Sequence, residues 1–221
     1  MAETADLPPS LTRESEEADF FHETALNATW TGVRLAVGGL SFAFGCFVFA
    51  YFYLRSLNSH GMWYPAGFKG PQPWAGAVIM AMVVVSAALQ YVGLTRIKAG
   101  NKRAWQASAV AALVLGLAAI GLQVWQLLNL PFYPGSAGFA SVFVGATPVF
   151  LIVVLAAMIW LETLIMRARV IPAISFVEQP PTYAEAFAVQ RFQSSLSAFT
   201  VLWNYLAVIA ILFWILFYLT A

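Results

Sequence analysis

Five long apolar stretches constrain this chain more than any other feature of its sequence. A helix needs about 20 mostly apolar residues to cross the roughly 30 Å hydrocarbon core of a bilayer. Each stretch reaches that length, and breaks rich in glycine, proline or basic residues separate them. The sequence therefore predicts an all-α fold, a polytopic transmembrane bundle of five helices. We place the spans at about residues 31–54, 74–95, 104–130, 141–166 and 198–219.

Charged residues are too few to build the surface of a soluble protein. Only 10% of the 221 residues are charged and 61% are hydrophobic, whereas about a quarter of an average soluble domain is charged. The net charge of +1 gives no reason to expect a nucleic-acid partner. The single cysteine, Cys46, excludes an intrachain disulfide and any CxxC site.

The first 30 residues differ in character from the rest. They hold seven acidic residues and one basic residue, Arg13, whereas a secretory signal begins with a basic region. We divide the chain into an acidic cytoplasmic N-terminal segment, residues 1–30, and a five-helix transmembrane domain, residues 31–221. Pro8 and Pro9 predict that the first part of the segment is disordered. Residues 14–30 are expected to form a short helix on the membrane surface.

The distribution of lysine and arginine predicts the orientation. With five spans, the N-terminus shares a side with the second and fourth loops, and the opposite side holds only Arg55 and Lys69. Loops rich in lysine and arginine stay in the cytoplasm, so we expect a cytoplasmic N-terminus and an outside C-terminus. The cytoplasmic set is Arg13, Arg96, Lys98, Lys102, Arg103, Arg167, Arg169 and Arg191.

Ligands for a redox metal are scarce inside the spans. Haem and copper are held by histidine, methionine or cysteine. The two histidines, His22 and His60, lie outside the spans, and isolated intramembrane methionines such as Met158 are normally packing residues. We therefore expect no catalytic residue, no metal site and no cofactor in this chain.

Charged residues at the ends of two spans are the candidate functional residues. Glu162 is the only acidic residue inside a span, where a charge costs about 2.5–3.5 kcal/mol at the helix centre. It can pair with Arg167 or Arg169, or it can accept a proton or bind a partner. Arg34 lies in the first turn of the first span, from which its side chain can reach anionic lipid headgroups.

Four neutral polar residues inside the spans, Gln90, Gln123, Gln126 and Asn204, are interpreted as packing residues. Gln123 and Gln126 are one helical turn apart and can also bond to a neighbouring helix. Such bonds contribute about 0.6 kcal/mol on average.

Three stretches together resemble subunit III of the haem-copper cytochrome oxidases. Their order and spacing match a short, five-helix form of that family over residues 30–221. The first is AYFYLR at residues 50–55, the second is the pattern G-x-x-S-x-F-x-x-x-T from Gly138 to Thr147, and the third is Trp203-Asn204-Tyr205 followed by Phe217-Tyr218-Leu219.

The chain departs from this family at its ionisable positions. The family's Ser-Glu pair in the first of these helices is replaced by Gly39-Leu40, so the buried carboxylate is absent. The two histidines expected shortly after Thr147 are missing, and the histidine of the family's W-H-F motif is Asn204. The resemblance therefore implies a scaffold role and not a proton relay.

What the resemblance implies is a non-catalytic subunit of a proton-pumping terminal oxidase. Such a subunit stabilises the catalytic subunit, holds phospholipid and lies in the plasma (inner) membrane as a multi-pass protein of the respiratory chain. Haem and copper would belong to the catalytic partner, and other respiratory subunits would also contact this chain.

Three alternatives stay open at this point. One is the subunit-III-like accessory protein of a nitric oxide reductase, and another is a small stand-alone channel or transporter. The paired broken helices typical of secondary transporters are not evident. The third is an enzyme with its own site, but Glu162 without an intramembrane histidine is too little for one.

Overall fold

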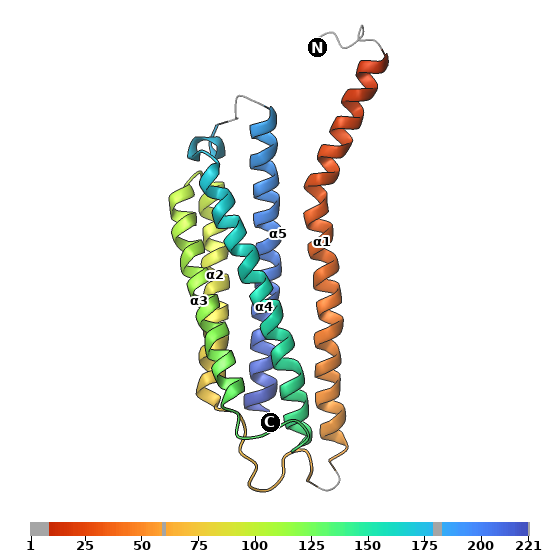
Figure 1. Ribbon diagram of the computed structural model, residues 1–221, viewed down its shortest axis with the longest axis vertical. Coiled ribbons are helices and arrows are strands. Elements are labelled where there is room, and N and C mark those ends of the chain that lie inside the picture. Colours follow the sequence, from red (N-terminus) through yellow and green to blue (C-terminus); the bar gives the residue numbers. More distant parts are fainter. Residues whose placement is uncertain (1–8, 59–60, 179–182, 221) are drawn as a thin grey trace.

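The computed structural model describes residues 9–58, 61–178 and 183–220. Consecutive long helices reverse direction, so η2 ends at the opposite end of the bundle from the start of α1 (Figure 1). All five long helices are apolar enough to span a membrane, and the described residues contain no strand. The predicted all-α bundle of five spans is confirmed, as expected for a multi-pass membrane protein. The elements are α1 (Pro9–Ser56), α2 (Pro73–Lys98), α3 (Lys102–Leu128), α4 (Gly138–Val170), the 3₁₀ turn η1 (Ala173–Phe176), α5 (Tyr183–Trp214) and the π-helix η2 (Ile215–Leu219).

The first helix starts at Pro9, well before the predicted span. The predicted disorder is therefore wrong from Pro9 onward, and residues 1–8 lie outside the described residues. Residues 14–30 continue α1 and do not form a separate surface helix. Their alanine and glutamate residues are good helix formers, and the following span supplies an already formed helix to extend. The first part of α1 leans away from the other helices (Figure 1).

The last helix also starts early, so most of the loop predicted over residues 167–197 is helical. The physical reason is an amphipathic sequence that directly precedes the fifth apolar stretch. Apolar residues recur there at helical spacing and are buried against the bundle. They are Val189, Phe192, Leu196 and Phe199, none more than 7% exposed.

α5 forms the centre of the bundle and α1 its least covered part. In the most apolar stretch of each span, 56% of the residues are buried in α5 but only 11% in α1. α5 packs against α1, α2 and α4, whereas α1 packs mainly on α5 and α4. Large apolar side chains on α1 therefore face outward, including Leu35, Phe42 and Phe49.

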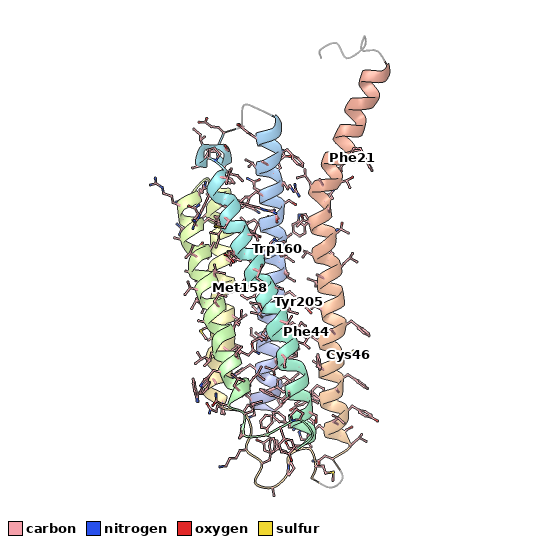
Figure 2. All side chains as sticks on the ribbon, viewed as in Figure 1. Phe21, Phe44, Cys46, Met158, Trp160 and Tyr205 are labelled. Atoms are coloured by element: carbon pink, nitrogen blue, oxygen red, sulfur yellow. The ribbon has the colours of Figure 1, made fainter. Side chains whose placement is uncertain are left out.

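Phe44 is the main anchor of α1 on the other helices. It is 1% exposed, and its ring lies 5.4 Å from that of Phe213 and 6.1 Å from that of Phe150. Cys46, two residues later, is exposed on the side of α1 that faces away from the bundle (Figure 2). One face of α1 is thus protein-facing and the other is free.

A tight turn joins α2 to α3, which form the most extensive helix pair. Gly100 has φ +81°, a left-handed conformation that ends helices and favours glycine. The Asn101 side chain then accepts a hydrogen bond from the Ala104 amide at 3.0 Å and caps α3. Lys102 donates to the carbonyl of Ile171, so the start of α3 is also attached to the end of α4.

The middle of the α3–α4 contact depends on a glycine. The Met158 side chain, 1% exposed, occupies the position that a Cβ at Gly116 would take. At Gly121, on the same helix, a Cβ would meet nothing within 4 Å. Close approach of helices over small residues is how membrane helices pack.

Gly116→Val should destabilise the bundle by about 1–3 kcal/mol because it overpacks the Met158 contact. Gly121→Val is the matched control, since it adds the same side chain to the same helix in open space. Thermal unfolding of both variants in detergent micelles measures the difference. Equal midpoints for the two variants would contradict this packing.

The predicted orientation can be tested at two loops that lie at opposite ends of the bundle (Figure 1). Ala99 and Pro134 are both exposed, so each can be changed to cysteine in a Cys46→Ser background. We expect a membrane-impermeant maleimide to label Pro134→Cys in intact cells, and Ala99→Cys only after permeabilisation. The reverse labelling pattern would place the N-terminus outside.

Candidate functional site

The five residues that the sequence singles out do not come together in one site. Arg34 lies on α1, Glu162, Arg167 and Arg169 lie near the end of α4, and Asn204 lies on α5. The four charged residues are exposed and Asn204 is half-buried. Their arrangement suits contacts with lipid headgroups, water or another chain, and it does not form an enclosed reaction site.

Glu162 makes no ion pair among the described residues. Arg169 follows it by seven residues, which is nearly two turns, so the two lie on the same face about 10 Å apart along the axis. Arg167 is turned away by about 140° because each residue advances a helix by about 100°. Glu162 is therefore an isolated exposed carboxylate, separated from Arg169 on that face by the apolar residues Ile165 and Met166.

Arg34 lies beside other polar residues on a single face of α1. With Asn27, Trp30 and Thr31 it lines a shallow polar recess on the helix surface. A cation beside an indole ring at the end of a span is typical of the headgroup region. The predicted contact of Arg34 with anionic headgroups stays a prediction.

The residues that flank Asn204 make the contacts that Asn204 does not. The Trp203 indole nitrogen donates to Ser86 Oγ on α2 at 3.1 Å. Ser86 in turn donates to a backbone carbonyl of α3 at 2.7 Å. The Tyr205 hydroxyl accepts from Ser41 Oγ on α1 at 3.0 Å. The short motif around Asn204 thus connects α5 directly to α1 and α2, and through Ser86 to α3.

The stretches that carry the family resemblance meet at one end of the bundle, in an aromatic end cluster. Tyr51 comes from α1, Phe139 and Phe143 from α4, Phe217 from η2, and Trp63 from the loop after α1. Tyr51 lies 4.9 Å from Trp63 and 6.0 Å from Phe217, and Phe143 lies 5.2 Å from Phe217, ring centre to ring centre. All five are buried, none more than 5% exposed.

Hydrogen bonds attach the last residues of the described chain to this cluster. The hydroxyls of Tyr51 and Thr220 are 3.0 Å apart and share a hydrogen bond. Arg55 donates to the Tyr51 hydroxyl at 3.3 Å and to the Thr220 carbonyl. The end of α1 and the end of α5 are therefore held together by both rings and polar contacts.

Gln123 and Gln126 bond to neighbouring helices, whereas the buried Gln90 side chain has no hydrogen-bond partner among the described residues. Gln126 Nε2 donates to the Tyr218 hydroxyl at 2.9 Å, and Gln123 Nε2 donates to the Thr147 carbonyl at 3.5 Å. The Tyr218 ring occupies the position that a Cβ at Gly76 would take, so only glycine permits this approach to α2.

Potential metal ligands do not gather in the part of the chain that the structure describes. No group of three or more His, Cys, Asp or Glu side chains within the described residues could hold a metal ion. His22 lies in α1, and His60 lies outside the described residues.

No protein-family profile and no curated protein matches this chain. The resemblance to subunit III therefore stays a prediction from the motifs quoted above.

Tyr51→Phe should lower the stability of the folded bundle by about 0.5–1.5 kcal/mol, because it removes the hydroxyl that Thr220 and Arg55 share. Tyr53→Phe is the matched control, since Tyr53 is 52% exposed on the same helix and its hydroxyl makes no hydrogen bond in the described structure. Unfolding midpoints in detergent give both values. An equal effect of the two changes would show that the hydroxyl contacts contribute nothing.

Proposed function

We propose that this chain is a non-catalytic subunit of a larger membrane complex, with the role of subunit III in a haem-copper terminal oxidase. It would stabilise the catalytic subunit and hold phospholipid. The observation that carries this proposal is the aromatic end cluster. The three stretches that resemble subunit III bring their residues into contact there, as stretches of one family fold would.

The interior of the bundle supports a role without chemistry of its own. The buried polar side chains among the described residues are all neutral, and neutral hydroxyl and amide groups do not act as acids or bases near pH 7. Catalysis or ion transport by this chain alone would need an ionisable group or a metal in the interior. The buried neutral polar side chains are those of Ser86, Gln90, Gln123, Gln126, Thr147, Ser195 and Thr200.

The outer surface of α1 supports association with another chain. Phe42 and Phe49 are 77% and 69% exposed, and the rest of the bundle covers little of this helix. In a membrane such a face can pack against lipid or against a second protein. Because aromatic side chains bury a large area each, a catalytic subunit could cover this face.

The parent complex would perform the redox chemistry. Electrons would pass from cytochrome c or a quinol through haem and copper in the partner subunit to oxygen, with protons pumped across the plasma (inner) membrane. This chain would contribute the packing surface and the lipid contacts. Exposed charges such as Arg34 and Glu162 would contact headgroups or neighbouring subunits.

Purification through a tag on this chain in mild detergent should yield a complex with a large histidine-rich partner and haem bands in the reduced-minus-oxidised spectrum. The same tag on an unrelated membrane protein from the same cells is the control for adventitious binding. Mass spectrometry identifies the partner, and oxygen or nitric oxide consumption separates the two kinds of parent enzyme. A colourless preparation that contains only this chain would refute the proposal.

A further inference from the structure

A small, partly open cavity lies between the helices, at the end where α5 finishes. Its volume is about 40 Å³, and α2, α3, α4, α5 and η2 all contribute to its wall. Most of the wall is apolar, with Ile79, Phe150 and Phe213 among the lining residues. Polar side chains occur on the wall as well, and they decide what the cavity can hold.

Some of these polar groups already satisfy one another. Gln126 Nε2 donates to the Tyr218 hydroxyl at 2.9 Å, and that hydroxyl is 3.1 Å from Gln126 Oε1. Gln126 Nε2 also lies 3.3 Å from the carbonyl of Gln72. This pair closes one side of the cavity and needs no further partner.

Three other polar groups on the wall have no such partner. Gln123 is 6% exposed, and its amide oxygen makes no hydrogen bond in the described structure. Thr147 is also 6% exposed, and its hydroxyl makes none either. The Trp214 indole nitrogen is buried without a partner. Polar groups without partners are costly in a hydrocarbon environment.

The local backbone is unusual at the same place. Trp214 ends the α-helical part of α5, and the π-helical turn η2 follows directly. η2 supplies Phe217 and Tyr218 to the wall. Single π-helical turns are rare and are found frequently at functional sites. The cavity therefore coincides with the one irregular turn in a described transmembrane helix.

The wall defines the chemical class of its ligand. No charged side chain lines the cavity, so an ion has no counter-charge there. The ligand must donate to Gln123 Oε1 and accept from Trp214 Nε1, which an acyl chain cannot do. A water molecule needs at least about 10–15 Å³ of such space and two to four polar partners.

We propose that this cavity is a water-binding site, which holds about two or three water molecules between Gln123, Thr147 and Trp214. The water bridges α3, α4 and α5 by hydrogen bonds that the side chains cannot make directly. The site is neutral and separate from the exposed charged residues. It does not depend on the proposed role in an oxidase.

Water next to the Trp214 indole proton can be detected directly. The full chain, labelled with ¹⁵N on tryptophan, is reconstituted in lipid nanodiscs, and rotating-frame cross-relaxation to water is recorded. We expect a cross-peak between water and the Trp214 indole proton. Trp203 is the internal control, because its indole nitrogen is buried and donates to Ser86 Oγ, so it should show none. Trp214→Phe and Trp203→Phe assign the two signals.

Two variants test whether the water is held by the proposed groups. Gln123→Leu and Thr147→Val each remove a partner, and each should abolish the Trp214 cross-peak. Gln90→Leu is the matched control, since Gln90 is fully buried outside the cavity, and its replacement should leave the cross-peak unchanged. An unchanged Trp203 indole signal shows that a variant is folded.

Two results would overturn the proposal. A Trp214 cross-peak to acyl-chain protons, with none to water, would mean that lipid fills the cavity. A water cross-peak that survives in both Gln123→Leu and Thr147→Val would come from the membrane surface and not from the cavity. If neither variant folds, the unmodified chain still decides, through the presence or absence of the Trp214 signal relative to Trp203.

Discussion

Backbone amides inside a bilayer have no water to bond, and this constraint determines the architecture of the chain. Five apolar stretches satisfy it as five helices, and everything else follows from how these helices contact one another. α5 lies at the centre, where Trp203 connects it to Ser86 on α2 and through Ser86 to α3. α1 is added to the outside of α4 and α5. The bundle is thus held by a few specific contacts within a large apolar surface.

The number and type of the helices could be predicted from the sequence, but their ends could not. Spans were located by uniform apolarity, whereas the extension of α5 is amphipathic and buries only one face, through residues such as Val189 and Phe192. The sequence allowed hydrogen bonding by Gln126 but could not distinguish it from Gln90, whose buried amide has no partner in the described part of the chain. The partner of Gln126, Tyr218, was not predictable, because 92 residues separate the two. Ser86 carries no local signal that distinguishes it from other small residues.

Polar groups in the interior occur at two levels that do not connect. The bonds of Trp203 and Ser86 lie on one side of the contact between Met158 and Gly116, and the cavity beside Gln123 lies on the other. That contact is apolar and closely packed. Ionisable residues among the candidates lie on the surface instead. An interior divided in this way supports a role in packing and association, and it places any exchange with water at the ends of the bundle.

The attachment of α1 has a consequence for biosynthesis. Tyr51 bonds to Thr220 across a sequence separation of 169 residues, and α1 packs mainly on the last two long helices. At about 5–20 residues per second, the ribosome needs roughly 10–30 s to produce that much chain. Until α5 and η2 are made, the first helix is in the membrane without most of its contacts. Insertion and folding of this chain are therefore separate events, and the contacts of α1 with η2 and Thr220 close the bundle.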